Sequence, residues 1–255
     1  MQRTALVTGA NSGIGKAIAS RLARCGYDVA INYKVDPVSA ERFATELQRS
    51  GSRAISVYAD VGNSSDVDAM FEKILSSFGK IDALVNNAGA QVWKPLLEVE
   101  EAEWDRVVTT NLKGCYLCTQ RAARNMKQHR SGAIVNIGSG CNKVPFPNLS
   151  GYTASKGGIE MFTKSAAMEL GPFDIRVNCI APGAIETERT KAEVADFAKS
   201  WSALTPLRRI GTTGDVASAV EFLLSEKASF ITGQTLAVDG GLFIQPRWPG
   251  SDYNT

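Results

Sequence analysis

Short apolar runs rich in β-branched residues alternate along this chain with longer segments of helical periodicity. Each run is too short for a helix and is bounded by turn residues, so we expect each to be a buried strand. Seven such runs occur, at residues 4–9, 28–33, 53–60, 81–87, 132–139, 174–183 and 234–241.

The segments between these runs repeat apolar residues at every third or fourth position, which places Ile14, Ile18 and Leu22 on one helical face. A second amphipathic helix is expected to begin behind an N-cap candidate at Ser64. Regular alternation of strand and helix predicts right-handed crossovers and a parallel sheet covered on both faces. We therefore predict an α/β fold with one doubly wound, seven-stranded parallel sheet.

Composition favours one soluble domain over residues 1–255. The chain has 255 residues, of which 44% are hydrophobic and 21% charged, enough to bury a large core. The net charge of +2 is too small to indicate nucleic acid or an anionic membrane as a partner. No apolar run approaches the ~20 residues of a membrane helix, and strand-like sequence from Thr4 leaves no room for a signal peptide. We expect a cytoplasmic protein.

The cysteines do not form a secreted-type framework, because their number is odd. Cys115 and Cys118 spell C-x-x-C inside a helical pattern, without a second such pair, which favours buried thiols over a metal or redox site. His129 is the only histidine, which excludes serine–histidine chemistry and most zinc chemistry. No metal site is expected. The other cysteines are Cys25, Cys141 and Cys179.

The ends of the predicted strands carry the candidate chemistry, because ligands bind beyond the carboxyl ends of a parallel sheet. A glycine-rich turn follows the first strand and opens a helix. Glycines let the backbone approach a phosphate, and the helix N-terminus offers free N–H groups. Its spacing is G-x-x-x-G-x-G, and such a turn can also serve helix packing. The candidate cofactor contacts here are Gly9, Asn11, Ser12, Gly13, Ile14 and Gly15.

The second predicted strand ends at Tyr33 and Lys34, where a dinucleotide would present its adenosine ribose. An acid at this place holds the ribose hydroxyls of NAD, whereas a cation accommodates the 2′-phosphate of NADP. We expect NADP(H) to be preferred, with NAD(H) as an alternative and a plain surface lysine as another interpretation. Asp60 and Val61 could contact the adenine, or Asp60 could simply begin a turn. Small residues for a flat cofactor follow at Asn87, Ala88 and Gly89.

The stretch GYTASKGG places Tyr152 and Lys156 about one helical turn apart, on one face. A cation beside a phenol favours the phenolate, which suits an acid/base group for hydride-transfer chemistry. Ser139, at the end of the fifth strand, could hold the substrate oxygen. Gly157 and Gly158 are expected to let this helix lie close to another backbone. A surface Tyr/Lys pair is the alternative interpretation.

Together these motifs resemble the short-chain dehydrogenase/reductase family in its classical type, over about residues 4–241. The resemblance implies one Rossmann domain, a dinucleotide cofactor, and hydride transfer between nicotinamide and a secondary alcohol or carbonyl. It implies a catalytic set of Asn111, Ser139, Tyr152 and Lys156, with Asn111 as a structural turn or water relay; a helix-terminal asparagine is the alternative. A clamp on the cofactor carboxamide is implied at Pro182, Gly183, Ile185 and Thr187.

Within that family the chain looks most like glucose 1-dehydrogenases and related sugar dehydrogenases. Substrate contacts are expected from Ser139, Gln91, Cys141 and Tyr152, under a lid at 184–209 and beside a C-terminal tail at 242–255. Gln91 and Cys141 stand where the glucose enzymes would carry glutamate and histidine. The wider lining includes Asn142, Asn148, Trp93, Phe146 and Trp201, and packing explains such aromatics as well as ligand contact does.

Two other functions stay open. A 3-oxoacyl carrier-protein reductase would share the fold and the catalytic set, but Phe173 occupies a place where arginine is expected. A basic face at residues 121–130 could dock an acidic carrier or be merely solvated. A dinucleotide-binding regulator without turnover is the non-enzymatic alternative. The resemblance also implies a homotetramer, assembled through the helices around 113–127 and 153–170 and through the tail.

Overall fold

A seven-stranded parallel sheet forms the centre of the molecule. The computed structural model describes residues 2–193 and 196–244, and in them the strand order is β3-β2-β1-β4-β5-β6-β9. The predicted fold class and all seven predicted strands are confirmed. The strands are β1 (Arg3–Val7), β2 (Tyr27–Tyr33), β3 (Ala54–Tyr58), β4 (Ala83–Asn86), β5 (Gly132–Ile137), β6 (Ile175–Pro182) and β9 (Thr235–Val238).

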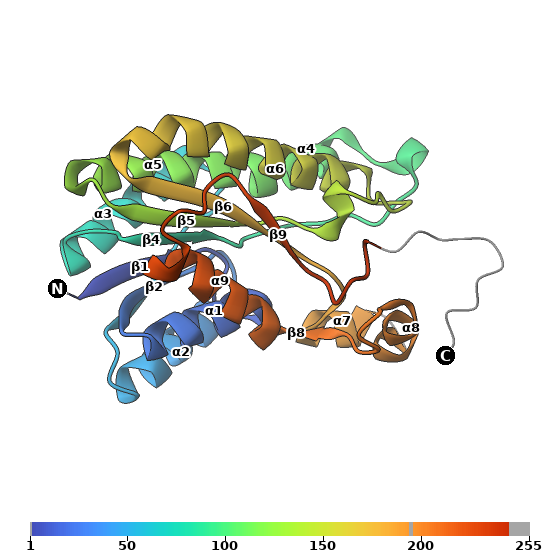
Figure 1. The fold of residues 1–255 in the computed structure, drawn as a ribbon, viewed down its shortest axis with the longest axis horizontal. Helices are drawn as coiled ribbons and strands as arrows, with labels where there is room; N and C mark the ends of the chain where they lie inside the picture. The colour runs from blue at the N-terminus through green and yellow to red at the C-terminus, as the bar shows by residue number, and fades with distance from the viewer. Residues whose placement is uncertain (1, 194–195, 245–255) are drawn as a thin grey trace.

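Helices cover both faces of this sheet (Figure 1). On one face lie α1 (Gly13–Arg24), α2 (Pro37–Arg49) and α9 (Thr213–Leu224). On the other lie α3 (Ser64–Phe78), α5 (Gly114–His129) and α6 (Ser150–Leu170), with α4 (Glu101–Val108) preceding α5. A π-helical turn spans Thr109–Lys113, and short 3₁₀ turns span Leu96–Glu98, Gly140–Asn142, Gly171–Phe173 and Glu226–Ala228.

The two faces of the sheet feed two cores, as the alternation of side chains along a strand requires. Val7 and Val85 enter the core beneath α1, α2 and α9. Leu6 and Leu84, one position earlier, enter the core beneath α3, α5 and α6. All four are fully buried, and burying a valine or leucine side chain contributes about 1.5–3 kcal/mol. Both cores hold the strands rigidly, so their carboxyl ends form a fixed platform.

Several strands end earlier than the sequence pattern predicted. The runs expected to reach residues 9, 60, 87 and 139 end at Val7, Tyr58, Asn86 and Ile137. In each case the last residues turn out of the sheet into the loops that carry the candidate motifs. The order reverses between β1 and β4, which is the switch point where ligands bind in such sheets.

A small substructure beyond the carboxyl ends of the strands was not predicted. β7 (Ile185–Glu186) pairs in parallel with β8 (Gly211–Thr212), and α7 (Glu188–Glu193) and α8 (Phe197–Leu204) lie beside them (Figure 1, right). It overlaps the segment 184–209 that we expected to form a lid, and it extends beyond that segment to Thr212. Within that lid, residues 194–195 lie outside the described residues, as do residues 245–255 of the predicted tail.

One predicted helix start is wrong by a residue. α3 begins at Ser64, so its N-cap is Asn63, whose side-chain oxygen accepts hydrogen bonds from the amides of Ser65 and Asp66 at 2.9 and 3.3 Å. Both residue types are good N-caps, so the sequence alone did not separate them.

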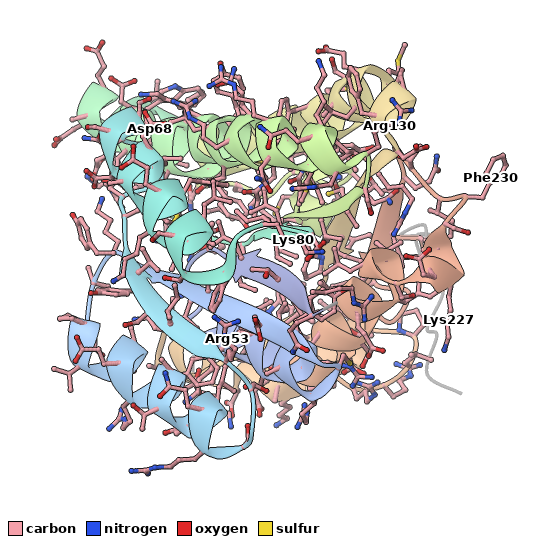
Figure 2. The ribbon with its side chains drawn as sticks, turned by 90° about the vertical axis from the view of Figure 1, so that its left-hand side faces the viewer. Arg53, Asp68, Lys80, Arg130, Lys227 and Phe230 are labelled. Carbon is pink, nitrogen blue, oxygen red and sulfur yellow. The ribbon has the colours of Figure 1, made fainter. Side chains whose placement is uncertain are left out.

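The opposite end of the sheet, where the strands begin, is a charged surface. Figure 2 views this end and labels Arg53, Lys80 and Arg130, which lie just before β3, β4 and β5. Arg53 lies 3.2 Å from Asp28, and Lys80 lies 2.7 Å from Asp82. These basic residues are partnered locally, and the candidate chemistry lies at the other end. Among the described residues, no helix is long and apolar enough to cross a membrane.

Candidate active site

The glycine-rich turn after β1 is shaped by contacts that only glycine permits. Gly9 and Gly13 have φ values of +59° and +52°, in the region that favours glycine. The backbone of Gly15 packs most tightly against its neighbours, since a Cβ there would lie 2.3 Å from the Gly9 carbonyl oxygen and 2.5 Å from Asn87 Nδ2. Ser12, the N-cap of α1, makes no capping hydrogen bond, and the first turn contains no acid. The start of α1 therefore suits an anion such as a pyrophosphate.

Hydrogen bonds from neighbouring strands hold this turn in place. The Gly9 amide donates to Asn32 Oδ1 at 3.1 Å, and Asn87 Nδ2 donates to the Thr8 and Gly9 carbonyls at 2.9 and 3.0 Å. Thr8 Oγ1 accepts from the amides of Asn87 and Ala88, both at 2.9 Å. Sequence reasoning missed Asn32. Its signal was a polar residue inside a buried strand, where it needs partners.

Lys34 and Asp60, predicted to contact opposite parts of the adenosine, meet in an ion pair of 2.6 Å. Asp60 also accepts from the Gly62 amide at 3.0 Å, so it does begin a turn. Partial burial opposes ionisation of this carboxyl, but the hydrogen bonds from Lys34 and Gly62 outweigh it and hold the pKa of Asp60 below its ordinary value. Lys34 remains about half exposed.

The other predicted adenosine contacts gather at the same end of the sheet. Val61 is buried against Gly114, where a Cβ would lie 2.7 Å from its side chain. Tyr33 packs edge-on against Tyr58, with ring centroids 6.0 Å apart. The ends of β2 and β3 thus form one surface next to the glycine-rich turn.

Asn111 lies in the π-helical turn between α4 and α5, and it is 2% exposed. Its side-chain oxygen accepts from the Ala90 amide at 2.7 Å, and its Nδ2 donates to the Ala90 carbonyl and to Ser155 Oγ, both at 2.9 Å. Ser155 in turn donates to the Tyr152 carbonyl at 2.7 Å. The interpretation of Asn111 as a helix-terminal asparagine is wrong, because the helical backbone continues on both sides of it.

These bonds join three elements of the site. Asn111 fixes the loop after β4 and, through Ser155, the helix that carries Tyr152. Sequence reasoning missed Ser155. Its position three residues after Tyr152 on α6 was the available signal.

Tyr152, Lys156 and Ser139 converge from two elements. Lys156 is 4% exposed, its Nζ donates to the Ile137 carbonyl at the end of β5 at 2.7 Å, and it lies 5.4 Å from the centroid of the Tyr152 ring. Ser139 follows two residues after Ile137, and its Oγ accepts from the Cys141 amide at 3.2 Å. The buried Lys156 ammonium thus joins the Tyr152 ring of α6 to the end of β5, two residues before Ser139 in the chain.

The expectation for the glycines after Lys156 is wrong. A Cβ at Gly157 would meet nothing within 4 Å, and a Cβ at Gly158 would meet the Leu112 side chain at 2.8 Å, not another backbone. Neither glycine has a positive φ.

The predicted carboxamide clamp packs between the turn after β6 and the glycine-rich turn. Gly183 lies against Asp239, whose Cα would be 2.7 Å from a Cβ at this glycine. Pro182 and Ile185 are buried. The Thr187 amide donates to Thr190 Oγ1 at 2.8 Å, and the Thr187 methyl lies 3.7 Å from the Cβ position of Gly13.

The residues predicted for the substrate side lie in different environments. Cys141 is buried beside Ser139, and this burial raises the pKa of its thiol although the hydrogen bond with Ser139 acts in the other direction. Gln91 is half-buried next to the anchored Ala90. The Nδ2 of Asn142 donates to Glu160 of α6, while its buried Oδ1 has no hydrogen-bond partner among the described residues. Trp93 is 59% exposed.

The C-x-x-C pair consists of free, buried thiols, as predicted. Burial raises the pKa of Cys118 to about 12 and also raises that of Cys115. Among the described residues, no cluster of three His, Cys, Asp or Glu side chains could hold a metal ion.

A doubly wound sheet with a glycine-rich turn at its switch point, and a Tyr/Lys/Ser group beside it, defines a dinucleotide-dependent oxidoreductase. A family model described as enoyl-(acyl carrier protein) reductase matches residues 9–243. The chain belongs to the short-chain dehydrogenase/reductase family, whose enzymes act on alcohols and ketones with NAD(P).

Three relatives illustrate the range of activities among similar proteins. The 3-oxoacyl-(acyl-carrier-protein) reductase FabG of Staphylococcus aureus is 42% identical, over 96% of this chain and 99% of its own length. A putative gluconate dehydrogenase from Agrobacterium tumefaciens has a TM-score of 0.91 and 36% identity, over 96% of this chain and 97% of that one. A gluconate 5-dehydrogenase from Burkholderia cenocepacia, in complex with NADP and tartrate, has a TM-score of 0.90 and 34% identity, over 96% of both chains.

Proposed function

We propose that this chain oxidises a polyhydroxylated substrate, an aldose at C1 in the first instance, with NADP⁺ preferred over NAD⁺. The observation that carries the proposed chemistry is the buried Lys156 ammonium, 5.4 Å from the Tyr152 ring centroid and anchored at the strand end that leads to Ser139. This arrangement supplies a proton-transfer group, a cation to support it, and a hydroxyl to hold the reacting oxygen.

A nicotinamide held beside Tyr152 would supply the hydride acceptor for oxidation and the hydride donor for reduction. As the phenolate, Tyr152 takes the proton from the substrate hydroxyl during oxidation and becomes the phenol, and during reduction the phenol returns that proton to the substrate oxygen. Lys156 supplies a positive charge 5.4 Å from the centroid of the Tyr152 ring, which offsets negative charge on the phenol oxygen while the proton moves. Ser139 donates a hydrogen bond to the substrate oxygen as negative charge develops on it. Asn111 holds the loop that leads to Gln91.

The residues at the β1 turn fit a dinucleotide. Gly9 and Gly15 let the turn pack tightly on Ala88, Asn87 and its own carbonyl, where a Cβ would collide, and the free start of α1 offers N–H groups to the pyrophosphate. Lys34 supports NADP as the preferred cofactor, because it supplies a half-exposed ammonium where the 2′-phosphate would lie. The structure of the B. cenocepacia relative with NADP is consistent with this preference.

The half-buried polar side chain of Gln91, next to Ala90, and the gluconate dehydrogenases named among the relatives support a polyhydroxylated substrate. Phe173, which replaces an expected arginine, has Lys127 over its ring at 4.4 Å. The second candidate is reduction of a 3-oxoacyl thioester, and the 42% identity to FabG over nearly the full length of both chains favours it. The two functions share the catalytic group and differ in the substrate they hold.

The deciding experiment compares kcat/KM for a panel of aldoses and aldonates, with NADP⁺ and with NAD⁺, against kcat/KM for an acetoacetyl thioester with NADPH. We expect the sugars to win. Gln91→Ala should raise KM for the preferred sugar, because an unpaired buried polar group costs about 1–3 kcal/mol. Gln91→Glu is the matched variant, since glutamate keeps an acceptor at this place. A clear win for the thioester would replace the sugar proposal with the second candidate.

The same assay separates both enzymatic functions from the non-enzymatic one. A dinucleotide-binding regulator would bind NADPH without consuming it, whatever carbonyl is offered. Turnover of any substrate in the panel removes that alternative.

We also propose a cytoplasmic homotetramer. Tyr116 on α5 and Met161 and Met168 on α6 are 43%, 64% and 80% exposed, which leaves apolar surface on the two helices expected to meet a second copy. Light scattering coupled to gel filtration measures the assembly, and a monomer at micromolar concentration would contradict the proposal.

A further inference from the structure

Gly140, the residue after Ser139, lacks a side chain because an aromatic ring occupies that space. A Cβ at Gly140 would lie 1.8 Å from Cε2 of Phe243, a residue of the C-terminal segment. Gly140 is buried and is not among the residues with a positive φ, so its backbone conformation does not require glycine. The ring of Phe243 therefore rests directly on the backbone of the loop that carries Ser139.

Phe243 is the first member of an aromatic column, defined as Phe243, Phe146, Trp201 and Phe197. The rings of Phe243 and Phe146 meet edge to face, with centroids 6.1 Å apart, and Phe146 meets Trp201 in the same way at 5.9 Å. Trp201 and Phe197, both on α8, lie 6.2 Å apart. Edge-to-face pairs at such distances are favourable and directional. The column thus runs from the Ser139 loop to α8.

The C-terminal end of the column is anchored to the body of the protein. Both carboxylate oxygens of Asp239 accept backbone hydrogen bonds, from the Gly241 amide at 2.9 Å and from the Phe243 amide at 3.0 Å. The carbonyl of Gly240 accepts from the Leu207 amide at 3.2 Å, in the segment that follows α8. The turn at 239–243, which directly follows β9, therefore contacts both the segment after α8 and the loop that carries Ser139.

We propose that Phe243 is a positioning residue for Ser139, and that the aromatic column makes the position of Ser139 depend on where α8 lies. Substrate contact is left to Ser139 and Tyr152, while Phe243 acts through the backbone of Gly140. This inference rests on the proposed role of Ser139. In the structure, three segments far apart in sequence, at 139–146, 197–201 and 239–243, share the column.

The test begins with Phe243→Ala in the full chain, assayed with whichever alcohol the wild type oxidises best. We expect kcat to fall about tenfold to a hundredfold, the effect of a small misplacement of a catalytic group. The Kd for NADPH, measured by fluorescence, should stay within about twofold, because the residues around the pyrophosphate keep their contacts. Phe243→Leu keeps apolar volume and should lose less. Phe230→Ala, at a fully exposed phenylalanine labelled in Figure 2, is the control and should leave kcat unchanged.

Exchanging the sizes of the side chains at positions 140 and 243 distinguishes a positioning role of Phe243 from a general loss of packing. Gly140→Ala adds a methyl where the ring now lies, so alone it should lower kcat. Adding Phe243→Ala to Gly140→Ala removes the collision, and the double variant should exceed Gly140→Ala in kcat by about threefold or more. Trp201→Ala, at the far end of the column, should lower kcat without raising the Kd for NADPH. Its effect should combine with that of Phe243→Ala less than multiplicatively.

Three results would overturn the inference: an unchanged kcat in both Phe243 variants, multiplying effects of Gly140→Ala and Phe243→Ala, or a Trp201→Ala effect confined to KM. If Phe243→Ala does not fold, Phe243→Leu and the swap still give an answer. Ser139→Ala in the same assay separates this inference from the proposed function. If Ser139→Ala keeps full activity, the proposed role of Ser139 is wrong. If Ser139→Ala loses activity but Phe243→Ala keeps the wild-type kcat, only the positioning role of Phe243 is wrong.

Discussion

The proposed cofactor half and the proposed substrate half of the site are built differently. In the cofactor half, the turn after β1 and the loop after β4 are joined by hydrogen bonds between backbone and short polar side chains, such as Asn87 Nδ2 to the Gly9 carbonyl at 3.0 Å. In the substrate half, the Ser139 loop, α8 and the C-terminal segment are joined through aromatic rings whose centroids lie 5.9 and 6.1 Å apart. Hydrogen bonds of the first kind fix residue type and spacing, whereas ring packing fixes only volume and shape.

This difference separates binding of the cofactor from selection of the substrate. A dinucleotide presents the same pyrophosphate to every member of the family, so a cofactor half with one geometry serves all of them. A substrate half held by volume can change its lining residues while it keeps its scaffold. FabG and the gluconate dehydrogenases among the relatives, at 34–42% identity, fit this division.

The largest expected effect is on kcat, in a variant of the substrate half that should leave cofactor binding unchanged. Tyr152→Phe removes one hydroxyl and leaves the bond from Lys156 Nζ to the Ile137 carbonyl intact. We expect kcat to fall about 10²–10⁴-fold, the usual contribution of a general acid/base. The Kd for NADPH should remain unchanged. Steady-state kinetics and a fluorescence titration measure the two quantities.

Ser165→Ala, on the exposed part of α6, is a matched loss of one hydroxyl from the same helix, and it should keep full activity. Retention of more than about a tenth of kcat in Tyr152→Phe would remove Tyr152 from the proton-transfer role. A large rise in the Kd for NADPH would instead show that the two halves are not separable.

Sequence pattern anticipates the geometry of the β1 turn better than that around the Ser139 loop, for the same physical reason. Seven strands and the order of the loops follow from periodicity, and the positive φ values of Gly9 and Gly13 and the close approach of Gly15 occur where the spacing after the first strand places glycines. Local pattern does not contain the ring contacts of Phe243, because its partner Phe146 lies about a hundred residues away in the chain. The pairing of β7 with β8 was missed because two-residue strands carry no periodicity.

One error came from assigning a side chain by type. Gly157 was expected to meet another backbone because glycines often do, yet outside its own helix and chain neighbours nothing described lies within 4 Å of its Cβ position. The residue type allows several environments, and tertiary structure selects one of them.

The second prediction perturbs the cofactor half alone. Lys34→Ala removes the cation at the end of β2 and leaves Asp60, its partner at 2.6 Å, as an unpaired carboxylate. NADP(H) should bind more weakly by about 1–3 kcal/mol, because a charge-assisted bond is lost and the free carboxylate repels the 2′-phosphate. NAD(H) should bind as well as before or better, since an acid at this place can accept from its ribose hydroxyls. KM for each cofactor, at saturating substrate, gives the comparison.

The double variant Lys34→Ala/Asp60→Asn divides the two causes. If repulsion by Asp60 dominates, neutralising Asp60 should restore much of the affinity for NADP(H). If loss of the Lys34 bond dominates, the double variant should bind NADP(H) as weakly as Lys34→Ala does. kcat should stay near the wild-type value in both. Equal changes in KM for NADP(H) and NAD(H) would show that Lys34 is only a surface charge.

The smallest expected effect lies in neither half. Gly157→Ala places a methyl in open space on α6, where no described atom lies within 4 Å, and the glycine has no positive φ. Alanine in a helix interior is more stable than glycine by about 0.5–1 kcal/mol, because it restricts the unfolded chain, so the melting temperature should rise by a few degrees. Gly158→Ala is the matched control, since its methyl would meet Leu112 at 2.8 Å and should give no gain. A fall in the melting temperature of Gly157→Ala, together with a loss of assembly in gel filtration, would contradict this prediction. It would also indicate that a second copy of the chain packs against this glycine, because the isolated chain offers the methyl no obstacle.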